Sequence, residues 1–157
     1  APVFDARARL LVLGSFPGAA SLQDAQYYAH PRNAFWPLMG ALLGDAGLSA
    51  LPYAQRLDAL RRHRVALWDA VAACRREGSL DTAIEDAEPS DLPHLVARLP
   101  QLRAIACNGS LAHRQASLAL GDPGVPVLRL PSTSPAHAGR SLADKIDAWR
   151  AALSPYL

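Results

Sequence analysis

Cysteine, lysine and long hydrophobic runs are what this chain has least of. Its 157 residues include two cysteines, Cys74 and Cys107, which are too few for a disulfide framework and do not form a CxxC pair. No apolar run reaches the roughly 18 residues of a membrane-spanning helix, and the first residues do not read as a signal peptide. We therefore expect a protein of the reducing cytoplasm that has no membrane span.

The motifs of several enzyme classes are also missing. The sequence has no GxSxG nucleophile elbow, no P-loop and no GxGxxG turn, so it lacks the usual means of cradling a nucleotide pyrophosphate. The five histidines do not have the spacing of metal ligands, and the four cysteines of an iron–sulfur cluster are absent. The sequence therefore predicts a site that uses neither a metal nor a cofactor.

Positive charge is present but modest. The net charge is +2, and Lys145 is the single lysine among 16 Lys and Arg residues. Arginine makes forked contacts to phosphates, but a GC-rich genome that favours arginine codons explains the same composition. Charge alone therefore supports nucleic-acid binding only weakly.

Short apolar runs alternate with amphipathic segments along the whole chain. Buried strands are predicted at residues 9–15, 65–71, 102–109 and 125–130. Helices are predicted at residues 34–47, 52–64, 91–100, 110–120 and 141–153, with loops at 16–23 and 131–139. This alternation predicts one domain over residues 1–157, with an α/β fold: a three-layer α/β/α sandwich around a central four-stranded parallel sheet.

The unusual segments follow the predicted strands. Residues 14–18 (GSFPG) follow the first strand, Asn108 ends the third, and residues 131–138 (PSTSPAHA) follow the fourth. Asn33 stands just before the helix after the first loop, in the position of an N-cap. Because ligands bind at the carboxyl ends of parallel strands, these segments are expected to surround one cleft.

Three stretches resemble the uracil-DNA glycosylase superfamily, and within it the hypoxanthine-DNA glycosylase branch. They read LLVLGSFPGAASLQDAQYYAHPRNAFWPLM, CNGSLAHRQ and LPSTSPAHAG, and their order agrees over nearly the whole chain. The resemblance implies a monofunctional glycosylase that hydrolyses the N-glycosidic bond of hypoxanthine or uracil flipped out of DNA, in base excision repair. It implies DNA with deaminated bases as the partner and no cofactor. A chain without repeats or a coiled coil is expected to be a monomer.

The first motif departs from the wider superfamily at one position. Many members carry an Asp or Asn inside it, in forms such as GxNPG or GQDPY, where this chain has Phe16. The resemblance to the hypoxanthine branch assigns the catalytic role to Asn33 of HPRN, whose carbonyl would hold the attacking water. The alternative is that Asn33 only caps a helix. Asp69, which closes the second strand, is the rival general base, and Asp81 is a weaker one.

The other candidate residues fall into two groups. Phe16 is expected to stack under the flipped base, and the amide of Asn108 to read its ring N–H and C=O. With them, the base-binding group is Gly14, Ser15, Phe16, Tyr28 and Asn108. The DNA-binding group is Pro17, Gly18, His30, Ser132, Ser134, Pro135 and His137, and Thr133 is also expected to offer its hydroxyl to a phosphate. Structural roles stay open beside these: core aromatics for Phe16, Tyr27 and Tyr28, a turn for Asn108 and a helix cap for the serine-rich loop.

A second class of function also stays open. Because the first motif lacks a carboxylate, a non-catalytic module on the same fold could recognise damaged or single-stranded nucleic acid. Cleavage of a labelled inosine duplex by hot alkali separates the two classes, since only a glycosylase leaves an abasic site.

Overall fold

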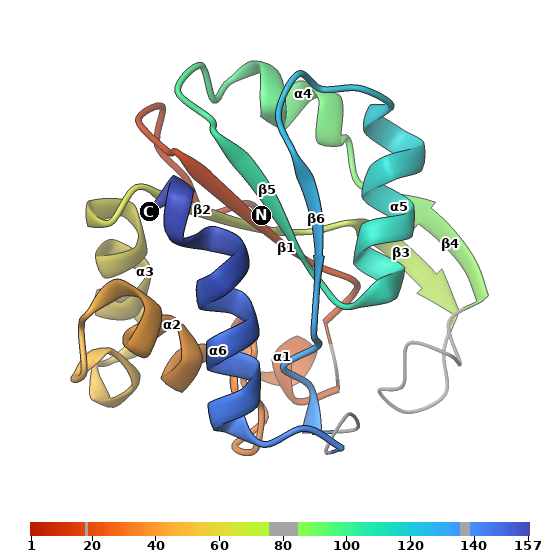
Figure 1. Cartoon of the computed structure of the whole chain (residues 1–157). Coiled ribbons are helices and arrows are strands. Elements are labelled where there is room, and N and C mark those ends of the chain that lie inside the picture. Colours follow the sequence, from red (N-terminus) through yellow and green to blue (C-terminus); the bar gives the residue numbers. More distant parts are fainter. Residues whose placement is uncertain (18, 76–84, 136–138) are drawn as a thin grey trace.

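A parallel β-sheet of four strands forms the centre of the molecule (Figure 1). The computed structural model describes the chain except residues 18, 76–84 and 136–138. The strands lie in the order β2 (Val65–Asp69), β1 (Leu10–Gly14), β5 (Ala104–Asn108) and β6 (Val127–Leu130). Each neighbouring pair is parallel, which confirms the four predicted strands and their arrangement.

Helices cover both faces of this sheet, which confirms the three-layer sandwich (Figure 1). One face carries α2 (Phe35–Leu43), α3 (Tyr53–Arg62) and α6 (Leu142–Leu153), and the other carries α4 (Leu92–Ala97) and α5 (Ser110–Leu120). The central strand β1 shows why both faces must be covered. Leu10 and Val12 pack with the first group of helices, Leu11 and Leu13 pack with the second, and all four are buried.

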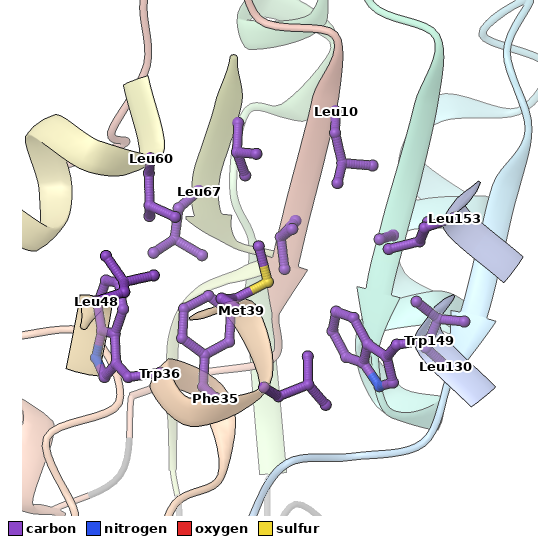
Figure 2. Packing of buried hydrophobic residues seen from close by; sticks show 14 of the residues in the cluster. Leu10, Phe35, Trp36, Met39, Leu48, Leu60, Leu67, Leu130, Trp149 and Leu153 are labelled. Carbon is purple, nitrogen blue, oxygen red and sulfur yellow. The ribbon is translucent and has the colours of Figure 1, made fainter. Parts of the chain in front are cut away.

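The larger hydrophobic core lies between the sheet and the layer of α2, α3 and α6 (Figure 2). Phe35 and Met39 of α2 and Trp149 of α6 are fully buried in it. Burial of one such side chain contributes about 1.5–3 kcal/mol. Trp149 also donates its indole N–H to the carbonyl oxygen of Pro131 at 2.9 Å. The core therefore fixes the start of the loop that follows β6.

One predicted loop contains a helix. Residues 16–23 are predicted as a loop, but Ala19–Asp24 form a short helix, α1. The first two residues of the helix, Ala19 and Ala20, have the highest helix propensity, but the Pro-Gly pair before them reads as a turn in the sequence.

A small second sheet was not predicted. The strand predicted at 65–71 ends at Asp69, and β3 (Val71–Arg75) pairs antiparallel with β4 (Glu85–Pro89) in a separate two-stranded sheet. The sequence of β4, EDAEP, is acidic and ends in proline. These residues are depleted in strands, so the segment gives no strand signal.

Short 3₁₀ helices follow α2 and α6, at Leu48–Ala50 (η1) and Ser154–Tyr156 (η4). No helix in the described part of the chain is both long enough and apolar enough to cross a membrane.

The four parallel strands bring their carboxyl ends to one edge of the sheet. In the register, Gly14 at the end of β1 pairs with Asp69 at the end of β2, and Asn108 of β5 pairs with Leu130 of β6. The segments that follow these residues therefore meet at this edge, as the sequence predicts.

Candidate active site

A pocket of about 570 Å³ opens at the carboxyl edge of the sheet. Of the residues predicted to be catalytic or to contact a base or DNA, those that line it are Gly14, Ser15, Phe16, Pro17, Tyr28, His30, Asn33, Asn108, Ser132, Ser134 and Pro135. Gly18 and His137 lie outside the described residues, as does Asp81. The structure thus brings together, around one pocket, all the predicted site residues that it describes.

Helix α1 supplies a wall that the sequence did not reveal. Ala20, Ser21 and Leu22 line the pocket, as do Ala25 and Gln26 just after the helix. A segment interpreted as a loop has no predicted face, so its residues carried no signal for a pocket. The hydroxyl of Ser21 also accepts the backbone N–H of Ala29 at 3.0 Å, which tethers the segment leading to Asn33.

Asn108 and Thr133 form a buried pair in the pocket wall. The backbone N–H of Thr133 donates to Oδ1 of Asn108 at 2.9 Å, and Nδ2 of Asn108 donates to Oγ1 of Thr133 at 2.9 Å. Because a backbone N–H can only donate, it fixes which end of the Asn108 amide faces it. Asn108 is 6% exposed and Thr133 is 1% exposed. The pair therefore joins the loop after β6 to the end of β5 in one defined orientation.

The Thr133 hydroxyl continues this series of hydrogen bonds to Asn33. Having accepted from Asn108, it donates to Oδ1 of Asn33 at 2.8 Å. The same Oδ1 accepts the backbone N–H of Phe35 at 3.0 Å. An amide oxygen has two lone pairs, and these two donors use both. Within the described part of the chain, the Nδ2 group of Asn33 makes no hydrogen bond.

These contacts argue against the predicted use of the Asn33 carbonyl. A water molecule in the pocket would find that oxygen already engaged, whereas the amide nitrogen has two N–H groups to offer. Helix α2 begins at Phe35 with Ala34 as its N-cap, so Asn33, the predicted N-cap, lies one residue before the observed cap. Asn33 still accepts an otherwise unpaired N–H of the first helical turn, that of Phe35, and it also lines the pocket, where its catalytic role stays a prediction.

Thr133 is not placed to contact a phosphate, and that expectation is wrong. Its hydroxyl is buried and lies between Asn108 and Asn33. Its neighbours Ser132 and Ser134 are partly exposed, and the Ser132 hydroxyl accepts the backbone N–H of Ser134 at 3.1 Å. Three successive hydroxyl residues look alike in sequence, but the middle one faces inward.

Tyr28 links the pocket to the hydrophobic core. Its ring stacks on Phe35, with centroids 4.0 Å apart and planes at 16°, and its hydroxyl accepts from Nδ2 of Asn108 at 3.3 Å. Its backbone has a φ of 55°, a left-handed conformation that is uncommon and costly for a residue other than glycine. Tyr27 also lines the pocket, and burial raises its pKa above the ordinary tyrosine value. Both tyrosines therefore belong to the pocket and to the edge of the core.

Gly14 lies where the pocket wall has no room for a side chain. A Cβ atom there would come within 2.7 Å of the Tyr28 hydroxyl oxygen and 2.8 Å of Oδ1 of Asp69. Real Cβ atoms do not approach polar oxygens so closely. This crowding is a physical reason for glycine as the first residue of GSFPG.

Asp69 supplies the negative charge of the pocket. It ends β2, is partly exposed, and its backbone carbonyl accepts from the Ser90 hydroxyl at 2.6 Å. Among the described residues that line the pocket there is no other carboxylate and no lysine or arginine. No group of three His, Cys, Asp or Glu side chains gathers as metal ligands would in the described part of the chain.

Phe16 is part of the pocket wall, and its stacking on a base stays a prediction. It is partly exposed, lines the pocket and belongs to neither hydrophobic core. With Phe16, the tyrosines and the asparagines, the part of the pocket that the structure describes presents aromatic and amide surfaces and one carboxylate. Such a lining suits a flat, uncharged ligand that makes hydrogen bonds.

The chain is similar to known proteins in both sequence and structure. The family model of the uracil DNA glycosylase superfamily matches residues 1–153. The hypoxanthine DNA glycosylase of Methanosarcina barkeri is 42% identical over 108 residues, which are 69% of this chain and 68% of that protein. The hypoxanthine DNA glycosylase of Methanosarcina acetivorans is 38% identical over 135 residues, covering 86% and 84%. A solution NMR structure from Methanosarcina acetivorans, described as a candidate uracil DNA glycosylase, has a TM-score of 0.82 and 34% identity, covering 96% of this chain and 94% of that one.

Proposed function

The chain belongs to the uracil DNA glycosylase superfamily, and we propose that it is a DNA glycosylase that releases hypoxanthine, and by the same contacts uracil, from DNA. Two relatives at 42% and 38% identity are hypoxanthine DNA glycosylases. The single observation that carries the proposal is the hydrogen-bonded chain from Asn108 through Thr133 to Asn33 in the wall of the pocket.

The substrate base enters the pocket by leaving the DNA helix. Extrusion costs a few kcal/mol and is least costly at mismatched or damaged pairs, which include deaminated bases. Support comes from the size of the pocket, about 570 Å³, which lies within the range of small-ligand sites. Stacking on Phe16 would recover about 1–3 kcal/mol.

Asn33 is the catalytic residue in this proposal, and it acts through its amide nitrogen. Water attacks C1′ of the deoxyribose, the bond from C1′ to the base nitrogen breaks, and its electron pair leaves with the base. Negative charge therefore develops on the base, where a fixed N–H donor stabilises it. The engagement of Oδ1 by Phe35 and Thr133 supports this assignment, because it leaves Nδ2 for the substrate.

Asp69 takes the part that the Asn33 carbonyl was expected to play. It holds the attacking water and accepts its proton, while the departing base gains a proton from solvent. Support comes from the carboxylate being the one acidic group in the described lining of the pocket. It also lies beside Gly14 and Tyr28, at the end of the neighbouring strand.

Asn108 reads the base mainly through its oxygen. Hypoxanthine and uracil each present a ring N–H beside a C=O, and Oδ1 of Asn108 has a second lone pair that can accept the ring N–H. Its Nδ2 already donates to Thr133 at 2.9 Å and to Tyr28 at 3.3 Å. A base carbonyl would have to replace the longer contact, the one to Tyr28. Gly14, Ser15 and Tyr28 complete the base-binding set of the proposal.

The DNA strand would run past the rim of the pocket. Pro17, His30, Ser132, Ser134 and Pro135 are the described residues we propose to contact it, and Gly18 and His137 are proposed from sequence alone. The proposal further takes the chain to be a single domain that acts as a monomer in the reducing cytoplasm. Cys107 fits such a setting, since its thiol is buried, forms no disulfide among the described residues and has its pKa raised to about 12 by burial.

The test is cleavage of labelled duplexes that carry one deoxyinosine, deoxyuridine or deoxyxanthosine, followed by hot alkali. The expected result is an alkali-labile site at deoxyinosine and at deoxyuridine. A protein that binds the inosine duplex but leaves no abasic site would instead be a recognition module without catalysis.

A further inference from the structure

Lys145, the single lysine of the chain, is almost wholly buried. It lies on α6 and is 5% exposed. Its backbone N–H donates to the carbonyl of Ser141 at 3.1 Å, but no hydrogen bond or ion pair joins its ammonium group to any residue in the described part of the chain. The apolar stem of a lysine is buried at little cost, but an ammonium group that loses solvent without gaining a partner is destabilised.

Lys145 lines a second hollow together with two exposed arginines. The hollow is lined by Gly109, Ser110, Arg129, Leu130, Pro131, Ser132, Gly139, Arg140, Lys145, Ala148 and Ala152. No aspartate or glutamate stands among these described residues. Burial and the nearby positive charge of Arg140 both lower the pKa of Lys145 from its ordinary value. The described lining of the hollow therefore brings together three cationic side chains and no acidic one.

The amino end of α5 opens on the same hollow. Gly109 is the N-cap of this helix, with a φ of 97° and no side chain to accept the first N–H groups, and Ser110 is its first residue. The backbone N–H of Gly109 itself donates to the carbonyl of Leu130 at 2.9 Å. The following N–H groups and the helix dipole favour an anion at this end. The uncapped helix and the unpartnered ammonium group are independent features, and both favour an anion in this hollow.

The hollow adjoins the pocket of the candidate active site, which we call the base pocket after its proposed ligand. Ser132 lines both, and Gly109 follows Asn108 directly in the chain. A nucleotide with its base in the pocket keeps its phosphates within a few bonds of that base, so a phosphate is the anion this location would receive. We propose that Lys145, Arg140 and the amino end of α5 bind one backbone phosphate of the DNA strand whose base occupies the pocket. This inference rests on the proposed function.

The experiment removes the charge of one phosphate and the charge of the Lys145 side chain, separately and together. Duplexes carry 2′-fluoro-deoxyinosine, which resists cleavage, and a single methylphosphonate at each position around it in turn. Dissociation constants are measured for the parent and for Lys145→Met, which keeps an unbranched apolar stem without the charge. Arg103→Gln is the control, because Arg103 is an exposed cation at the amino edge of the sheet.

A methylphosphonate at one position should weaken binding by the parent about tenfold. The same substitution should leave binding by Lys145→Met nearly unchanged, because this variant has no charge to pair with that phosphate. The slope of log Kd against log salt should fall by about 0.9 in Lys145→Met. Arg103→Gln should behave as the parent at every position. Arg140→Gln should reproduce the same coupled position at a smaller size, which keeps the test decisive if Lys145→Met does not fold.

Two results would overturn the proposal. If no position couples to Lys145, the lysine contributes only the packing of its apolar stem. If inorganic phosphate raises the Tm of the parent but not of Lys145→Met while no position couples, the hollow takes a free anion and not the DNA backbone. Cleavage of unmodified deoxyinosine duplex by the parent is measured separately. Its absence would reject the glycosylase function and leave the phosphate coupling as a separate result.

Discussion

Two hollows lie side by side at the carboxyl edge of the sheet, and they are built on opposite principles. In the base pocket, the polar groups of Asn33, Thr133 and Asn108 satisfy one another, so that their orientation is fixed before any ligand arrives. In the second hollow, the ammonium group of Lys145 has no partner among the described residues, and Arg140 repels it. A fixed neutral network suits selection of a base by its shape and hydrogen bonds. An uncompensated positive charge suits a phosphate, which every nucleotide carries.

The largest effect is expected when the hydrogen-bond donor of the base pocket is removed. Asn33→Asp keeps an oxygen for the Phe35 N–H and for the Thr133 hydroxyl but removes both N–H donors. We expect single-turnover cleavage of deoxyinosine duplex to fall at least about 100-fold, because one preorganised donor to the leaving base is lost. Asn33→Ala should fall by a similar factor, and its Tm is measured because loss of the helix contact costs about 1 kcal/mol.

The two variants separate the possible roles of Asn33. If its oxygen held the attacking water, a carboxylate there would be as good a base or better, and Asn33→Asp would cleave at the parent rate or faster. That outcome would mean that Asn33, and not Asp69, holds the attacking water.

A smaller effect is expected from the residue that orients Asn33. Thr133→Val has nearly the same shape but removes the hydroxyl that donates to Asn33 Oδ1 and accepts from Asn108 Nδ2. Cleavage should fall about 10- to 100-fold while affinity for the uncleavable duplex stays within about threefold, because the hydroxyl does not touch DNA. Thr133→Ser restores the hydroxyl and should restore most of the rate. Equal losses in the Val and Ser variants would mean that Thr133 matters only for packing.

Steric crowding at Gly14 gives a third measurement. Gly14→Ala places a Cβ atom 2.7 Å from the Tyr28 hydroxyl and 2.8 Å from the Asp69 carboxylate, so one of them must move. We expect cleavage to fall about tenfold and stability to fall by about 1–3 kcal/mol, the usual range for overpacking. Gly47→Ala is the matched control, since a Cβ there meets nothing within 4 Å. A Gly14→Ala enzyme with parental activity would show that neither oxygen needs its present position.

The sequence predicts the sheet well because the four strands are short, continuous apolar runs of the kind buried on both faces. Leu10 to Leu13 alternate between two cores, yet no polar residue interrupts them. The helix α1 and the strand β4 were missed for opposite reasons. α1 follows a Pro-Gly pair that signals a loop, and the acidic β4 forms by pairing of its backbone with β3, which leaves no apolar pattern.

The sequence predicts which residues line the site, but it does not predict the hydrogen bonds among them. Gly14, Asn108 and the serine-rich loop follow strands, so parallel topology is enough to bring them together. The contact between Thr133 and Asn33 joins residues 100 positions apart and depends on which backbone N–H faces which amide. Lys145 stood out in the sequence only as the single lysine, since its burial depends on how α6 packs beside β6.

The smallest effect is expected from the unpartnered charge of Lys145 in the second hollow. The pKa of Lys145 is lowered in the folded protein, so between that value and 10.5 the unfolded chain binds more protons than the folded chain. In that window the stability of the parent rises with pH, and below it the penalty is fully present. Lys145→Met lacks this contribution. Its Tm relative to the parent should therefore be highest near pH 7 and should decrease, by at most about 3 °C, as the pH rises toward 10. Thr133→Val is the control from the neutral pocket, and its difference from the parent should not change with pH. A constant difference for Lys145→Met as well would mean that the ammonium group is already solvated, so that the second hollow carries no strain for a phosphate to relieve.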